Sequence, residues 1–162
     1  MIVQSESGLR VVCEEAGVEE SKEIINQLIE ELSKTHNGVG LSAPQIGIHK
    51  SVFILQDTTG FFTAYVNPVI KSYIDPFIHV KEGCLSFPGL WINTIRYKSV
   101  VVVDDLSGGP KLLNNFGAII AQHEIDHLNG ILFMDRKVPE LYDPCFCGSG
   151  KKFKFCHYHE VR

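Results

Sequence analysis

No stretch of this 162-residue sequence stays apolar for the roughly 18 residues that a helix needs to cross a bilayer. Its first residues lack both the basic-then-apolar pattern of a secretory signal and the arginine-rich pattern of a transit peptide. It has no internal repeat and no low-complexity segment. The five cysteines are odd in number and unevenly placed, which argues against a disulfide framework. These absences predict a cytoplasmic protein that does not contact a membrane.

The composition is that of an ordinary globular protein, with 44% hydrophobic and 21% charged residues. The length suits one domain with a small appendage. The net charge of −4 is unevenly spread, because residues 144–162 are basic and the rest is acidic. This asymmetry is typical of a catalytic domain with a docking tail. The acidic body is a poor candidate for sequence-specific nucleic-acid binding.

Hydrophobic periodicity predicts an α+β fold of short mixed or antiparallel strands around a central helix. Apolar residues at helical spacing indicate a helix over 19–36, and a second helix is predicted over 115–130, ending at Asn129 and Gly130. Strands are expected over 51–56, 61–66, 77–83 and 98–104, with a short one over 131–135. Residues 1–16 are predicted to be irregular and 38–47 to form a glycine-rich loop. A composition shift near Pro144 divides the chain into a main domain, 1–140, and an appended module, 141–162.

The stretch AQHEIDHLNG carries the chemistry of the main domain. His123 and His127 are four residues apart, so on a helix both imidazoles face one side and can share a metal ion. Glu124 lies beside them and is expected to take a proton from a water that the ion activates. Asp126 is a candidate to orient one imidazole by accepting its second N–H.

A catalytic metal usually has three protein ligands and one open position, so a third ligand must come from elsewhere. The metzincin proteases need a histidine six residues after the second one, but Phe133 stands there. Proteases of the thermolysin type use a downstream glutamate, and only Glu140 and Glu160 remain, neither attractively placed. Cys84, in the glycine-flanked stretch EGCLSFPG, is a better candidate because thiolates bind soft or borderline ions well. A lone cysteine is normally a small buried hydrophobe, so the choice stays open on these grounds.

Three segments together resemble the peptide deformylases: GVGLSAPQ (38–45), EGCLS (82–86) and QHEIDHLNG (122–130). They occur in the order and at the spacing of that family, and the resemblance covers roughly 1–138. Ser42 departs from the family, in which alanine is more usual, and this small-for-small change is expected to be harmless. The resemblance implies that Cys84 is the third ligand. It also implies a catalytic ferrous ion, often replaced by zinc, nickel or cobalt.

The activity implied by the resemblance is hydrolysis of the N-formyl group from the N-terminal formyl-methionine of nascent polypeptides, which releases formate. Glu124 would move the proton, while the Gln45 side-chain amide and the Leu85 backbone N–H would stabilise negative charge on the formyl oxygen. Gly40 would lie along the substrate backbone. By the same correspondence, an ion pair between Glu82 and Arg96 braces the cysteine loop. An apolar methionine pocket is expected from four residues: Val39, Phe116, Ile119 and Ile120.

The tail sequence CFCGSGKKFKFCHYH predicts a second, closed metal site. It is similar to the zinc-binding module at the C-terminus of the preprotein translocase motor ATPase. That similarity implies zinc ligation by Cys145, Cys147, Cys156 and His157, with His157 chosen over His159. A segment this short cannot fold without the ion. With its lysines, the module is a candidate to dock the enzyme on the ribosome.

Two other readings of the sequence compete with the deformylase reading. An endopeptidase built on the same helix would cleave internal peptide bonds and would not depend on Cys84. A non-enzymatic zinc-binding adaptor would use the tail and carry a degenerate central site. The presence of Gln45, Glu124 and all three ligands argues against degeneracy.

Overall fold

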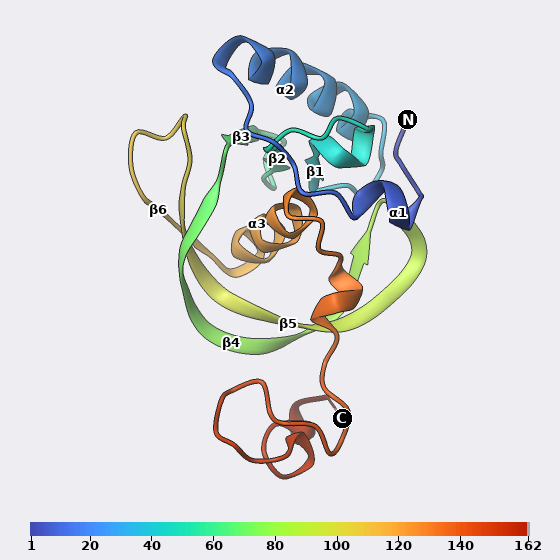
Figure 1. The fold of residues 1–162 in the computed structure, drawn as a ribbon, viewed down its shortest axis with the longest axis vertical. Coiled ribbons are helices and arrows are strands. Elements are labelled where there is room, and N and C mark those ends of the chain that lie inside the picture. The colour runs from blue at the N-terminus through green and yellow to red at the C-terminus, as the bar shows by residue number, and fades with distance from the viewer. Residues whose placement is uncertain (162) are drawn as a thin grey trace.

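A computed structural model describes residues 1–161, and for 160 and 161 the backbone alone. Residue 162 of the predicted appended module therefore lies outside the described residues. Two three-stranded antiparallel sheets, ordered β1-β2-β3 and β4-β5-β6, enclose the helix α3 (Figure 1). The elements in chain order are α1 (Glu6–Leu9), α2 (Val18–Ser33), β1 (Gly40–Ser42), the 3-10 helix η1 (Ala43–Ile46), β2 (Val52–Gln56), β3 (Phe62–Val66), β4 (Val69–Cys84), β5 (Phe87–Val103), β6 (Lys111–Asn114), α3 (Asn115–Leu128), and the 3-10 helices η2 (Phe133–Arg136), η3 (Phe153–Phe155) and η4 (Tyr158–Val161).

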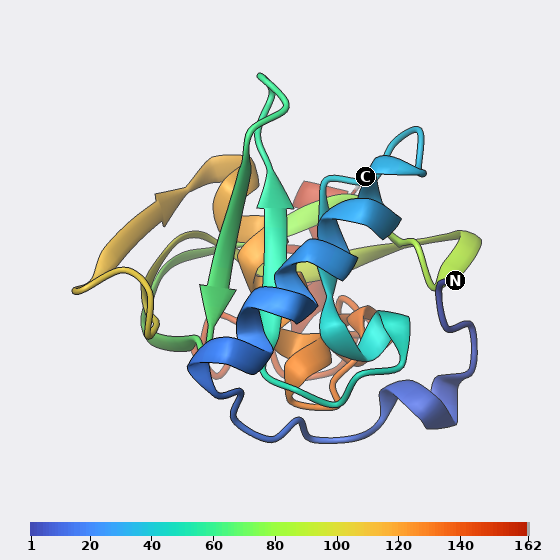
Figure 2. The ribbon, with the colours of Figure 1, turned by 90° about the horizontal axis from the view of Figure 1, so that it is seen from above.

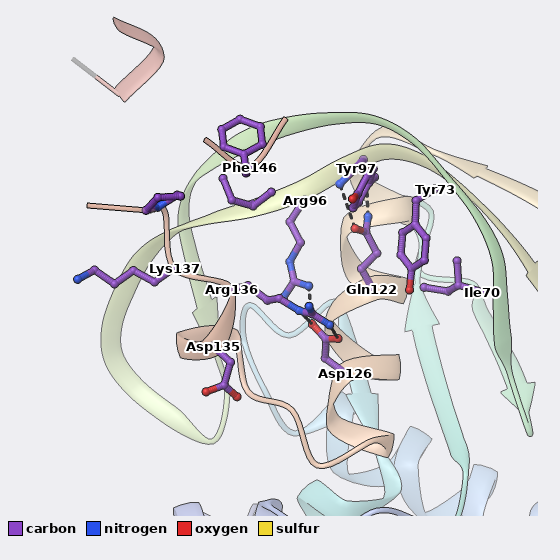
Figure 3. A pocket seen from close by; sticks show the side chains of 12 residues that line it. Ile70, Tyr73, Arg96, Tyr97, Gln122, Asp126, Asp135, Arg136, Lys137 and Phe146 are labelled. Carbon is purple, nitrogen blue, oxygen red and sulfur yellow. Dashed lines mark hydrogen bonds and ion pairs between the residues drawn. The ribbon is translucent and has the colours of Figure 1, made fainter. Parts of the chain in front are cut away.

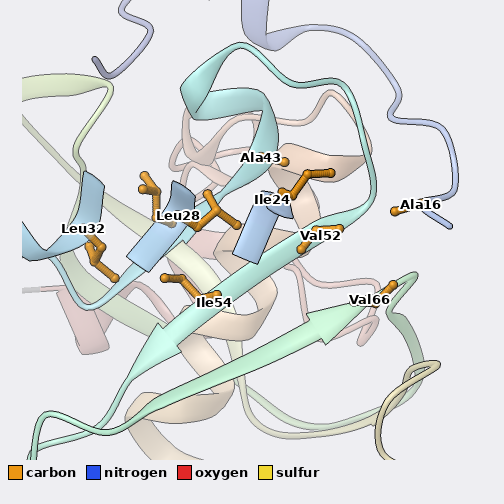
Figure 4. Close-up of a cluster of buried hydrophobic side chains, with 9 residues drawn as sticks. Ala16, Ile24, Leu28, Leu32, Ala43, Val52, Ile54 and Val66 are labelled. Atoms are coloured by element: carbon orange, nitrogen blue, oxygen red, sulfur yellow. The ribbon is translucent and has the colours of Figure 1, made fainter. Parts of the chain in front are cut away.

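The helix α2 covers the first sheet, as Figure 2 shows from above. Its buried residues Ile24, Leu28 and Leu32 repeat at helical spacing and pack on Val52 and Ile54 of β2 (Figure 4). The predicted helix over 19–36 is therefore confirmed, although it ends three residues earlier. The predicted strands over 51–56 and 61–66 are confirmed as β2 and β3, which pair in register from Val52–Val66 to Gln56–Phe62.

The long hairpin of β4 and β5 curves around α3 and carries the cysteine loop (Figure 1). The sequence predicted only pieces of these strands, at 77–83 and 98–104, because exposed residues on the outer face interrupt the hydrophobic pattern. Register shifts between His79 and Glu82 and between Gly83 and Cys84 bend the hairpin at its functional end. Lys81 has a φ of 58°, a left-handed conformation that the bend requires.

Several local predictions were wrong. The expected loop at 38–47 contains β1, which pairs with β2, and η1, which has Pro44 in its first turn. The expected strand at 131–135 is instead largely η2, because the Asp135 carboxylate accepts the Leu132 N–H and closes a helical turn. The irregular segment 1–16 contains the short helix α1, capped by the Ser5 side chain. The strand β6 was not predicted.

The helix α3 is buried along most of its length and confirms the predicted helix over 115–130. Its apolar side packs on Val100 and Val102 of β5 and on Phe53 and Tyr65 of the first sheet. Gly130 ends the segment with a φ of 67°, and a Cβ there would lie 3.0 Å from the Arg10 carbonyl carbon. The α+β class is confirmed.

The C-terminal module (143–158) forms a separate lobe against the hairpin, on the side away from α3 (Figure 1). Its core, with Phe153 and Cys145 buried, is shared with Ile78 of β4. Within 1–161, no helix combines the length and the apolar character needed to cross a membrane.

Candidate metal centre

Two neighbouring turns of α3 present the two histidines to one point. His123 and His127 are 8% and 1% exposed, and their ring centroids are 4.9 Å apart. Burial lowers the pKa of the His127 imidazole well below its ordinary value. The neutral imidazole that results is the form that binds a metal.

The cysteine at the end of β4 completes the group. The Cys84 Sγ lies 3.3 Å from the His127 Nε2, and one donor atom from each of Cys84, His123 and His127 lies within 4.8 Å of the others. One sulfur and two imidazole nitrogens at this separation suit a tetrahedral ion that has one position left for solvent. The structure thus brings together the three residues that the resemblance singled out.

Glu82 orients the first histidine. Its Oε1 lies 2.6 Å from the His123 Nδ1, which leaves Nε2 of that ring for a ligand. Arg96 donates to both carboxylate oxygens, at 2.5 and 2.8 Å, and the Thr94 hydroxyl donates at 2.5 Å. Burial alone would raise the pKa of Glu82, but Arg96 and His123 hold it far below its usual range. The predicted Glu82–Arg96 ion pair is confirmed.

Asp126, predicted to orient an imidazole, makes no such contact. Its carboxylate instead accepts hydrogen bonds from Arg96 and Arg136, each at 2.6 Å (Figure 3). Asp126 follows His123 by three residues, but its side chain lies in the cavity of about 490 Å³ behind the metal centre. That spacing favoured the wrong residue, because the true partner of His123 comes from β4.

The second motif places Gln45 beside the cysteine. Its Nε2 lies 3.6 Å from the Cys84 Sγ and 3.3 Å from the Ser86 Oγ. The Ser42 backbone N–H and hydroxyl both donate to the Gln45 Oε1, at 2.9 Å each. The amide group therefore points toward the metal centre. This role of Ser42 was not predicted, although Ser42 carries the hydroxyl of the motif and lies three residues before Gln45.

Gly40 lies against α3 at a distance that only glycine permits. A Cβ at this position would lie 2.5 Å from the Ile120 Cγ2 and 2.7 Å from the Glu124 Oε1. The resemblance implied that Gly40 lies along the substrate backbone. The contact found here is with the proposed proton carrier itself.

Glu124 is 3% exposed, and burial raises its pKa to about 6. Among the described residues, its Oε2 has no hydrogen-bond partner. A buried carboxylate oxygen without a partner carries a desolvation cost, which a water or ion at the centre would relieve. This unsatisfied atom agrees with the donor set: the residues present fit a metal ion and its water.

A cavity of about 390 Å³ opens beside these groups. Val39, Leu85, Phe116, Ile119 and Ile120 line it, together with Cys84, His123 and Glu124. All four residues expected in the methionine pocket thus lie on its wall. The cavity wall also includes Phe87, Leu90 and Trp91, which were not predicted from the sequence.

A second group of donors lies in the C-terminal module. The Cys145 Sγ is 3.1 Å from the His157 Nδ1, and the Cys147 Sγ is 3.6 Å from the Cys156 Sγ. One donor atom of each lies within 4.8 Å of the others, and His159 is not in the group. In the described part of the chain all five cysteines are free, so no disulfide competes for these thiols.

A helix that presents two histidines and a glutamate beside a cysteine thiol and an open cavity is typical of one class of protein, the metal-dependent hydrolases. Comparison with known protein families identifies which metal-dependent hydrolase the chain resembles. The family described as polypeptide deformylase matches residues 2–141, and the SEC-C motif matches residues 143–158.

Curated relatives agree with the family match. The chain is 36% identical to the peptide deformylase of Fusobacterium nucleatum over 124 residues, which cover 75% of this chain and 71% of the relative. It is 36% identical to the chloroplastic and mitochondrial peptide deformylase 1B of Arabidopsis thaliana, of whose length it spans 48%. The crystal structure of the Thermotoga maritima peptide deformylase matches with a TM-score of 0.75 and 36% identity, over 86% of this chain and 97% of that one.

The chain belongs to the peptide deformylase family and carries a C-terminal SEC-C motif. The resemblance stated from the three motifs is confirmed. The protein is a metal-dependent hydrolase that removes the N-formyl group from formyl-methionyl peptides, and the endopeptidase reading is not favoured.

Proposed function

We propose that Cys84, His123 and His127 bind the catalytic metal of this deformylase and that Glu124 carries the proton. One observation carries the assignment: a sulfur and two imidazole nitrogens converge within 4.8 Å beside a buried carboxylate. When bound there, a divalent ion lowers the pKa of a water and polarises the formyl oxygen. The resident ion is proposed to be Fe²⁺, with Zn²⁺, Ni²⁺ or Co²⁺ as substitutes, since the donor set accepts each of them.

Glu124 is proposed to act first as base and then as acid. It takes a proton from the water that attacks the formyl carbon, and it passes this proton to the methionine nitrogen as the C–N bond breaks. Formate and a free amino terminus are the products. The glycine at position 40 supports this role, because a Cβ there would lie 2.7 Å from the Glu124 Oε1 and would push the carboxylate out of its place beside the cavity.

Charge on the formyl oxygen is proposed to be stabilised by the Gln45 amide and the Leu85 backbone N–H. The hydrogen bonds from Ser42 support this role, because they fix the Gln45 Oε1 and so direct the Nε2 toward the cysteine side of the cavity. Donors that are already oriented cost no reorganisation during the reaction. Leu85 lines the cavity directly after Cys84.

Methionine is proposed to bind in the cavity beside the metal. Its walls there are the side chains of Phe116, Ile119 and Ile120, one face of the first two turns of α3. Val39 and Gly40 line the same cavity, and the peptide backbone would run along them. The unbranched methionine side chain suits such an apolar slot.

The deciding experiment measures formate release from a formyl-methionyl peptide, without oxygen and with Fe²⁺ supplied. The native chain should release formate, and Cys84→Ala should release at least about 100-fold less, because it lacks one of three ligands. Cys13→Ala is the matched control and should keep native activity. Release that survives loss of Cys84 would refute the ligand set. A native chain that cleaves nothing would favour the zinc-binding adaptor.

For the remainder of the chain, we propose a structural zinc ion on Cys145, Cys147, Cys156 and His157, and a domain boundary at residue 140. The end of one family match at 141 and the start of the other at 143 support this boundary. We also propose a cytoplasmic location, which the free thiols support.

The ribosome is the proposed partner of the module, through the exposed lysines Lys151 and Lys152. The test is co-sedimentation with ribosomes of the native chain and of Lys151→Glu/Lys152→Glu. Weaker binding of the double variant is expected, with Lys22→Glu/Lys71→Glu as the control for charge alone. Equal binding of all three proteins would remove this proposal.

A further inference from the structure

Near the metal centre, both faces of the hairpin β4–β5 are in contact with other parts of the chain: one with α3 and the other with the C-terminal module. Thr94 and Arg96 of β5 are 0% and 2% exposed and hold Glu82 on the α3 side. Ile95 lies between them in the strand, so its side chain points to the opposite face. Ile95 pairs in register with Ile78 of β4, and both belong to the cluster that includes the core of the C-terminal module.

The module thus packs on the back of the residues that orient His123. Phe153, 2% exposed, is its central side chain and shares a cluster with Ile78 and Ile95. One layer of backbone separates this apolar contact from the Glu82 network. Figure 1 shows the same order, with α3, the two strands and the C-terminal lobe in succession.

A second contact runs through the segment that joins the two parts. The Val138 N–H donates to the Asn93 carbonyl at 3.1 Å, and Lys137 forms an isolated bridge with Thr94. The Asn93 side-chain Oδ1 accepts the Lys81 N–H at 3.0 Å. Lys81 is the left-handed residue directly before Glu82. Asn93 therefore connects the joining segment to the bend that aims Glu82 at His123.

We propose that the C-terminal module is an internal brace for the metal centre: it holds the β4–β5 hairpin in place, with Asn93 as a positioning residue. The module (143–158) and the joining segment before it (137–142) supply to the outer face of the hairpin the packing that an exposed antiparallel strand pair otherwise lacks. The part of this inference that concerns activity rests on the proposed role of His123 as a ligand. The part that concerns the hairpin does not.

Hydrogen exchange of the full-length, metal-loaded chain tests the brace. Phe153→Ala should speed amide exchange in residues 77–96 by about 10-fold or more and leave α2 unchanged, because only the hairpin loses its support. Phe155→Ala is the matched control: it removes the same side chain two residues away, where it is 69% exposed. This control should exchange like the native chain. Faster exchange confined to 143–158 would overturn the proposal.

If Phe153→Ala unfolds the whole protein, a second pair of variants tests the proposal. Asn93→Leu removes the acceptor for the Lys81 N–H, and Asn93→Asp keeps it. Faster exchange at 77–84 with slower formate release in the leucine variant, both restored in the aspartate variant, supports the brace. If amide exchange at residues 77–84 is equally fast in Asn93→Leu and Asn93→Asp, the brace proposal is overturned. If the hairpin loosens while formate release stays native, the brace stands and the role proposed for His123 fails instead.

Discussion

The charged group behind His123 offers the sharpest test of how the site is held. Glu82→Gln keeps the shape of the side chain but removes its charge. The carboxylate accepts two hydrogen bonds from Arg96 and one from Thr94, and it contacts His123. Arg96 is 2% exposed, and among the described residues Asp126 is the one acidic partner that its charge would keep.

The expected loss of unfolding free energy in Glu82→Gln follows from the burial of these charges. Breaking a buried ion pair from one side costs about 3–5 kcal/mol. A domain of this kind has a free energy of unfolding of about 5–15 kcal/mol, so the variant should lose a large part of it. Urea unfolding followed by circular dichroism measures the difference.

A surface ion pair supplies the control for this experiment. Glu14 contacts Lys50, but its side chain is 81% exposed. Because water screens exposed pairs, Glu14→Gln should change the free energy of unfolding by no more than about 1 kcal/mol. If Glu82→Gln were as stable as Glu14→Gln, the buried network would not support the hairpin, and the reasoning would be refuted.

Three further predictions follow from burial and close contact. Gly40→Ala should lower formate release by about 100-fold or more with native-like secondary structure, because its Cβ would displace Glu124; near-native release would contradict this contact. Burial raises the pKa of Cys13 to about 11, so at pH 8 iodoacetamide should label it at least about 10-fold more slowly in the folded than in the urea-unfolded chain, measured by mass spectrometry. Leu28→Ala, in the core beneath α2, should cost about 2–5 kcal/mol in urea unfolding, whereas Val18→Ala, 73% exposed, should cost under about 1 kcal/mol.

Local pattern predicted the helices of this protein better than its strands. The apolar positions of α2 repeat at helical spacing, and α3 was indicated by a long segment that ends at Asn129 and Gly130. The hairpin β4–β5 alternates only in part, because its outer face is exposed in some places and covered by the C-terminal module in others. The turn at Phe133–Arg136 depends on a single capping contact from Asp135, which hydrophobic periodicity does not register.

The sequence by itself determined which chemical groups this protein can use. The spacing of His123 and His127 needs nothing but a helix, and resemblance to a family supplied Cys84. Only the tertiary structure decided which residues contact and orient those groups. Glu82, and not Asp126, orients His123. A bend in β4 places the Glu82 carboxylate against His123, although the two residues are 41 positions apart, and the spacing of residues along α3 gives no sign of this contact. Ligand types follow from residue identity, but the contacts that orient them depend on how distant segments pack.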